Sequence, residues 1–197
     1  MPAFRGNERM EAYEWISNKD LVNSAHMLMS GIDLDPASSD VANEYVNADT
    51  YYTPSEDGLN EKDWFGKVYL FPPNYSYFWH HKAQRWKKTR GLSPTLISGY
   101  SLWWRTLKRK WLSGEIEQAV YFCNCPDMVR YCQDIFDFPI CFLKSTPVLY
   151  RHFFDGGARD YRNTCTSFVV YLQPSDGADD YTQNFIDIYA EKGRIIV

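Results

Sequence analysis

The feature that most constrains the fold is a series of short apolar runs that end at chain-breaking residues. The clearest runs cover residues 66–71, 118–123 and 167–172, and the first stops at Pro72-Pro73. Runs of this length are typical of strands buried on both faces, as in parallel sheets. Stretches with helical spacing separate them, because Trp104, Leu107 and Trp111 recur at i, i+3 and i+7. This alternation predicts an α/β fold, with a mostly parallel sheet and helices on both faces.

The same patterns give the expected order of elements. We expect helices over residues 20–30, about 36–46, 76–90, 100–112, 126–136 and 181–190. We expect strands over residues 31–35, 49–53, 66–71, 118–123, 139–143, 167–172 and 194–197. The 197 residues contain no internal repeat and no clear boundary, so residues 1–197 are expected to form a single domain.

Composition excludes several classes of protein. The chain is 45% hydrophobic and 23% charged, which is ordinary for a globular domain. No apolar run reaches the length of a membrane-spanning helix, so we expect no membrane association. The polar N-terminus is unlike a signal peptide. The five cysteines are irregularly spaced, which favours reduced thiols and an intracellular location, in the cytoplasm, nucleus or an organelle.

Charge is distributed unevenly along the chain. The net charge is −4, yet residues 64–114 hold 10 basic side chains and no acidic one. Aromatic residues alternate with these cations over about 78–112, which we expect to be a basic aromatic helical segment. Cations neutralise phosphates and aromatic rings stack on bases, so the segment predicts nucleic-acid binding. The alternative is a solvated helix face with buried tryptophans, and both can hold. The candidate phosphate contacts are Lys82, Arg85, Lys87, Lys88, Arg105, Lys108, Arg109 and Lys110.

Residues 34–39 read Leu-Asp-Pro-Ala-Ser-Ser and follow an expected strand. A carboxylate at a strand end, followed by small residues and a helix start, suits a polar ligand. In α/β sheets ligands bind at the carboxyl ends of the strands, and both Asp35 and Pro72 fall at such ends. The alternative is an ordinary turn followed by a capped helix.

Several short motifs occur together in a characteristic order between residues 14 and 83. They are Glu14-Trp15, the 34–39 segment, Tyr52-Thr53, Asp57-Gly58-Leu59, Trp64, Pro72-Pro73, Tyr75-Ser76, Trp79 and Lys82-Ala83. In this order the chain resembles the small phage-type DNA N6-adenine methyltransferases. The resemblance implies a Rossmann-like S-adenosylmethionine methyltransferase fold, with DNA as the partner; RNA stays an alternative.

The resemblance also implies which residues bind S-adenosylmethionine. Asp35, Pro36 and Ala37, with Ser38 beside them, would line the methionine end of the cofactor. Asp57 would lie near the adenosine part, and Tyr52 or Thr53 would close that pocket. Trp15 begins a segment in which the family has Trp-x-Thr-Pro; here Ser17 replaces the threonine and keeps a hydroxyl, while Asn18 replaces the proline.

The implied catalytic loop departs from the family at two positions. The family places Asn or Asp before Pro-Pro, and that side chain accepts a hydrogen bond from the target amino group. Here Phe71 precedes Pro72 and Pro73, and phenylalanine cannot accept one. The second departure is Asn74, which stands where the family has an aromatic residue that stacks on the base. If the loop is shifted by one residue, the Pro72 carbonyl and Asn74 would share the amino group while Tyr75 stacks on the base. The alternative is a catalytically inactive pseudo-methyltransferase that serves as a nucleic-acid-binding or assembly subunit with protein partners.

The cysteines do not predict a metal centre. Cys123, Cys125, Cys132 and Cys141 lack zinc-finger or zinc-ribbon spacing, and their neighbours are apolar. Such thiols are typical of a hydrophobic core. We therefore expect no metal.

Overall fold

The computed structural model describes residues 13–60, 63–73, 75–89, 96–153, 158–162, 165–176 and 180–197. The helices are α1 (Lys19–Met29), α2 (Asp40–Val46), α3 (Gly99–Leu112), α4 (Met128–Tyr131), the 3₁₀ helix η1 (Gln133–Asp137) and α5 (Asp180–Tyr189). The strands are β1 (Tyr13–Ile16), β2 (Leu34–Asp35), β3 (Thr50–Tyr51), β4 (Lys67–Leu70), β5 (Ser76–His80), β6 (Arg85–Thr89), β7 (Ile97–Ser98), β8 (Gln118–Cys123), β9 (Ile140–Leu143), β10 (Val148–Phe153), β11 (Ala158–Arg162), β12 (Phe168–Leu172) and β13 (Gly193–Ile196).

The central sheet is mixed, so the predicted mostly parallel, Rossmann-like sheet is wrong. Its strand order is β13-β9-β12-β8-β4-β2-β3, and only β3, β2, β4 and β8 run parallel. β12, β9 and β13 each run antiparallel to their neighbours, and two further antiparallel sheets flank the centre. The direction of β12 was predicted wrongly from its apolar run, because a strand buried on both faces is apolar whether it runs parallel or antiparallel to its neighbours.

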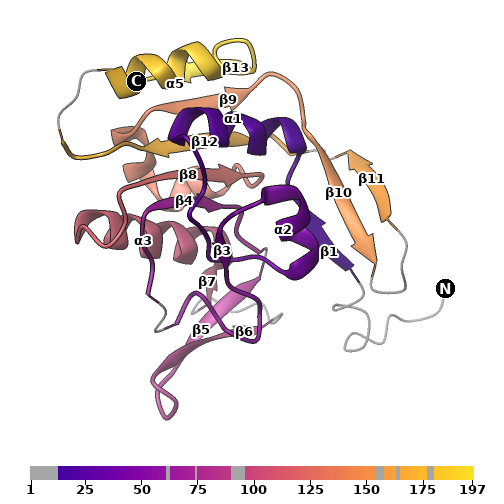
Figure 1. The fold of residues 1–197 in the computed structure, drawn as a ribbon. Helices are drawn as coiled ribbons and strands as arrows, with labels where there is room; N and C mark the ends of the chain where they lie inside the picture. Colours follow the sequence, from indigo (N-terminus) through magenta and orange to yellow (C-terminus); the bar gives the residue numbers. More distant parts are fainter. Residues whose placement is uncertain are drawn as a thin grey trace.

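Hydrophobic cores lie on both faces of this sheet. Along β4, Val68 and Leu70 point to the core shared with α3, whereas Tyr69 points to the core shared with α1 and α5. This period-two alternation is what a strand between two layers requires. Trp104 of α3 and Phe185 of α5 are both fully buried against opposite faces. The ribbon shows α1 and α5 on one side of the sheet (Figure 1).

The predicted helix over residues 76–90 is wrong, because β5 and β6 form an antiparallel hairpin there. The expected basic helical segment 78–112 is therefore this hairpin followed by β7 and α3. Tyr77, Phe78 and Trp79 are aromatic residues, which favour a strand over a helix. A turn at residues 81–84 joins the strands, with Gln84 at φ +50°. In Figure 1 the hairpin projects from the body of the molecule.

Most of the other predicted helices are confirmed by the structure. Asn18 caps α1 and Ser39 caps α2, each with a side-chain oxygen that accepts a backbone N–H. α3 and α5 agree with the predicted helices within a residue at each end. The predicted helix over 126–136 is only partly right, because α4 ends at Tyr131 and continues as the 3₁₀ helix η1.

The third sheet was not predicted, and it fixes the start of the described chain. β1 pairs with β10, which pairs with β11. The Asn18 amide also donates to the Val148 carbonyl at 2.9 Å. These contacts hold residues 15–18 beside the central sheet. Within the described ranges, none of the helices combines the length and the apolar character that crossing a bilayer demands.

Candidate functional site

The 34–39 segment forms a tight turn at the carboxyl end of β2. The Asp35 carboxylate is only 4% exposed and accepts the Ala37 N–H at 3.1 Å. The Ser38 N–H donates to the Tyr52 carbonyl at 3.0 Å, which ties the turn to the next loop. The chain leaves β2 for β3 on one side and later returns as β4 on the other. Such a reversal of strand order is where sheets of this kind bind ligands.

Tyr69 brings distant parts of the predicted cofactor site together. Burial raises the pKa of its phenol well above the usual value, the nearby Ser17 hydroxyl offsets part of this rise, and the Asp35 charge adds to it. Ser17 follows β1 and Asp35 ends β2, so two predicted residues meet at one side chain from β4. Nothing in the sequence singled out Tyr69, because its role depends on this meeting.

One buried hydroxyl group at this end of the sheet has no protein partner. Ser38 is 2% exposed, and its Oγ makes no hydrogen bond within the described ranges. Buried polar groups are nearly always hydrogen-bonded, and an unpaired one costs about 1–3 kcal/mol. The donor and acceptor capacity of this group therefore fits a polar ligand such as S-adenosylmethionine.

The loop after β3 lies directly against the turn. An added Cβ at Gly58 would lie 2.1 Å from the Pro36 carbonyl oxygen, so this close approach requires glycine. The Tyr52 hydroxyl donates to the Asp63 carbonyl at 2.6 Å, and the Thr53 N–H donates to Glu56 at 2.8 Å. The structure thus places Tyr52, Thr53 and Asp57 in one loop beside the 34–39 turn.

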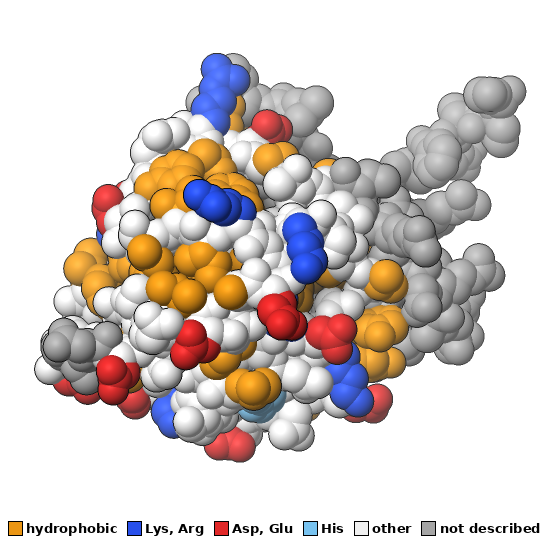
Figure 2. Space-filling model, turned by 90° about the horizontal axis from the view of Figure 1, so that it is seen from above, with side chains coloured by type: hydrophobic (Ala, Val, Ile, Leu, Met, Phe, Trp, Pro, Cys, Tyr) orange, Lys and Arg blue, Asp and Glu red, His pale blue; other side chains and the backbone are white. Residues whose placement is uncertain are grey.

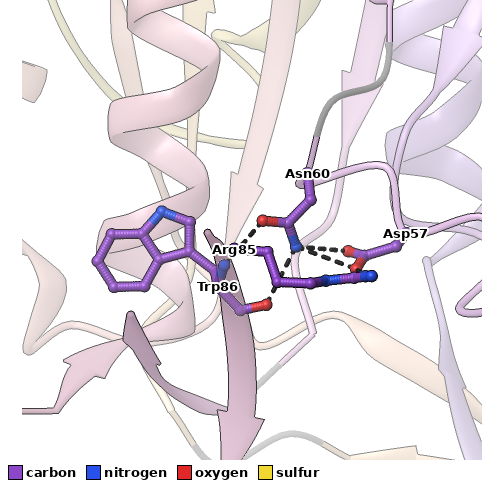
Figure 3. Close-up of polar contacts among 4 residues, drawn as sticks. All are labelled: Asp57, Asn60, Arg85 and Trp86. Carbon is purple, nitrogen blue, oxygen red and sulfur yellow. Dashed lines mark hydrogen bonds and ion pairs between the residues drawn. The ribbon is translucent and has the colours of Figure 1, made fainter. Parts of the chain in front are cut away.

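This loop is joined to the hairpin by a polar cluster, the Asp57–Asn60–Arg85–Trp86 cluster (Figure 3). The Asp57 carboxylate forms an ion pair with the Arg85 guanidinium. The Asn60 amide donates to the Trp86 carbonyl at 3.1 Å and accepts the Trp86 N–H at 2.8 Å. A predicted cofactor residue and a predicted phosphate contact therefore bind each other. Sequence patterns gave no signal for Asn60, which joins segments far apart in the chain.

The implied catalytic loop begins in an aromatic cluster. The Phe71 ring lies 4.8 Å from the Phe122 ring and packs against the core on the α1 side. Pro72 is buried, and the Pro73 carbonyl accepts the Tyr75 N–H at 3.0 Å. The Lys88 ammonium lies 5.0 Å from the centre of the Tyr75 ring. Asn74 lies outside the described residues.

Two of the four cations of α3 are engaged by acidic side chains. Lys108 lies 2.8 Å from Asp134 and 3.8 Å from Asp137, and Lys110 pairs with Glu115. The bond from Lys110 lowers the pKa of Glu115. Arg105 and Arg109 are exposed on the same helix. Helix α3 therefore offers fewer cations to a phosphate backbone than its sequence predicts.

On the hairpin, by contrast, Lys82, Lys87 and Lys88 are all exposed. The face on the side of α1 and α5 differs, because its basic side chains stand singly, separated by hydrophobic, acidic and uncharged surface (Figure 2). The predicted nucleic-acid contacts therefore divide into a hairpin group, with three exposed lysines and the ion-paired Arg85, and an α3 group, of which half are ion-paired.

All five cysteines are free thiols. Among the residues described, no group of three or more His, Cys, Asp or Glu side chains is arranged to hold a metal ion. Comparison with known proteins gave no match to any family model, curated protein or solved structure.

Proposed function

We propose that this chain is an S-adenosylmethionine-dependent methyltransferase that acts on the N6 amino group of adenine in DNA. The observation that carries the proposal is the convergence of separate motif segments at the carboxyl ends of β2 and β4. There Ser17 and Asp35 lie near the buried Tyr69, Ser38 belongs to the turn that follows Asp35, and the Pro72-Pro73 loop follows β4. The order of motifs between residues 14 and 83 supports the same function.

The residues of the chain divide the work between two neighbouring loops. The unpaired hydroxyl of Ser38 would hydrogen-bond a polar part of the cofactor, and the Asp35 carboxylate would attract a cationic one. The cofactor would supply a methyl group that a nucleophilic nitrogen can accept. The Tyr75 ring would stack on an adenine taken out of the DNA stack. For this, the Lys88 ammonium must leave the ring face.

Calorimetry with S-adenosylmethionine tests the cofactor site. We expect Asp35→Ala to abolish binding, because it removes the one buried carboxylate at the turn, while circular dichroism shows that the protein still folds. Asp40→Ala is the matched control, since Asp40 is exposed and lies five residues away. Equal affinity of the wild type and Asp35→Ala would refute the assignment of the pocket.

A second candidate function is supported by Phe71, whose ring is packed against Phe122 and cannot accept a hydrogen bond. In this second candidate function, the chain is a catalytically inactive pseudo-methyltransferase that binds nucleic acid or serves as an assembly subunit. Transfer of a radiolabelled methyl group to mixed genomic DNA separates the two. If the enzyme is active through a shifted loop, Asn74→Ala should lower turnover about 10²-fold or more with cofactor binding unchanged. A silent wild type that binds cofactor and DNA, with a trace of activity in Phe71→Asn, would favour the second function.

We infer an intracellular location for this activity. The five free thiols support it, because disulfides are rare where the cell keeps thiols reduced.

A further inference from the structure

The two faces of the β5–β6 hairpin have different surroundings. The register pairs Phe78 with Lys87 and His80 with Arg85. Side chains alternate between faces along a strand, so these four share one face, which we call the outer hairpin face. On the other face, Tyr77 is buried and accepts a hydrogen bond from Trp103 Nε1 at 3.3 Å. The outer hairpin face is therefore opposite the face that contacts α3; its Phe78 and His80 are partly exposed, and its Arg85 pairs with Asp57.

The outer hairpin face combines rings and cations. The Phe78 and His80 rings lie 6.2 Å apart between centroids, and Lys87 is exposed beside them. Residues 76–89 contain four Lys or Arg side chains and no Asp or Glu. Because the hairpin itself carries positive charge and no acidic side chain, it favours binding of a polyanion. Its rings at alternate strand positions favour a nucleic acid whose bases are accessible for stacking.

The rings are held in place before any partner binds. His80 Nδ1 accepts the Ala83 N–H at 3.1 Å, so the turn orients the His80 ring. The Gln84 amide donates to the His81 carbonyl at 2.7 Å within the same turn. Close to the turn, Asn60 fixes the backbone of Trp86. A surface ordered in advance loses less conformational entropy on binding.

We propose that the outer hairpin face binds single-stranded nucleic acid, with bases stacked on Phe78 and His80 and phosphates on Lys82 and Lys87. In a duplex the bases already stack on one another, so the rings would gain nothing from it. This inference deepens the proposed function by naming the form of nucleic acid that the chain holds. It depends on that function only for the choice of nucleic acid as partner.

The test measures binding of the full chain to two fluorescent probes by anisotropy. One is a thymidine-only single strand, and the other is a G·C-only duplex of the same length. Neither contains adenine and no cofactor is added, so the measurement does not depend on methyl transfer. We expect the single strand to bind more tightly than the duplex at equal salt.

Matched variants locate the contact. Lys82→Ala/Lys87→Ala should weaken single-strand binding and flatten the plot of log K against log salt by about 0.7 for each phosphate that is no longer bound. Arg105→Ala/Arg109→Ala removes the same charge from exposed positions on α3 and should have a smaller effect. Phe78→Leu keeps an apolar side chain without the ring, and should weaken single-strand binding about fivefold or more. Phe65→Leu, at an exposed phenylalanine outside the hairpin, should not.

Three results would overturn the inference. They are equal or tighter binding of the duplex, no effect of Phe78→Leu, and an equal loss of affinity in the α3 variant. Unchanged hydrogen exchange of the Trp86 amide in Phe78→Leu shows that the hairpin still folds. A chain that binds the single strand through the hairpin but never binds S-adenosylmethionine would refute the proposed function and leave this inference standing.

Discussion

Replacing Asn60 with alanine should open the contact between the 57–60 loop and the hairpin. β6 lies at the edge of its sheet, and the Asn60 amide makes both hydrogen bonds to the Trp86 backbone, of 2.8 and 3.1 Å. A hydrogen bond contributes a net of about 0.5–1.5 kcal/mol, so removing the pair costs about 2 kcal/mol of local stability. At 1.36 kcal/mol for each factor of ten, exchange of the Trp86 amide hydrogen should become about 30-fold faster.

Hydrogen exchange followed by NMR or by mass spectrometry of short peptides measures this change. The control is Asn43→Ala, because Asn43 makes the same two-way contact with the Ala48 backbone, at 2.9 and 3.1 Å. That variant should speed exchange of the Ala48 amide and leave Trp86 unchanged. Unaltered exchange at Trp86 in Asn60→Ala would show that solvent or another group protects this amide, and the reasoning would fail.

Trp104 is fully buried and packs edge-on against Tyr121 and Phe138, so Trp104→Ala should lower the free energy of unfolding measured in urea by about 3–5 kcal/mol. Leu112→Ala, at an exposed position, should change it by no more than about 0.5 kcal/mol, and similar losses in both variants would contradict the assigned core. Burial acts to raise the pKa of Asp134, but hydrogen bonds from Lys108 and Trp104 outweigh it and lower the pKa. A lowered pKa stabilises the fold above the unfolded-state pKa of about 3.9, and this stabilisation disappears as the pH falls through the folded-state value. The melting temperature of the wild type should therefore fall more steeply with acid than that of Asp134→Asn, and parallel curves would contradict this. Cys165 is exposed, so a thiol reagent should label it first, and Cys165→Ser should remove the fast phase while the buried Cys123 and Cys141 thiols, whose pKa values burial raises, react slowly.

Elements whose residues carry their own signals could be predicted from the sequence. The strand over 118–123 has the predicted bounds, because every residue in it is buried and nearly all are apolar. α1 and α2 begin where Asn18 and Ser39 supply a capping oxygen. These signals depend only on residues that are close in the sequence, so they predict the element without knowledge of its tertiary contacts.

Features set by distant segments could not be predicted. The stretch 76–89 forms a hairpin and not the predicted helix, because its aromatic residues and cations fit either spacing and contacts with Asn60 and Trp103 decide between them. Strand direction could not be predicted either, since the apolar pattern reports burial and not orientation. In the candidate site, the Asp35 turn could be predicted from its sequence motif. Tyr69 and Asn60 could not, because their contacts come from segments that are distant in the chain.

The pairing of β1 with β10 has a consequence for how the protein is made. Ile16 stands opposite Tyr150, and the Asn18 amide reaches a carbonyl 130 residues further along the chain. Ser17 therefore cannot be fixed beside Tyr69 until β10 has left the ribosome. At about 5–20 residues per second, translation leaves the first segment waiting roughly 7–26 seconds for its partner strand. Ligand binding through Ser17 should thus be among the last properties that a nascent chain acquires.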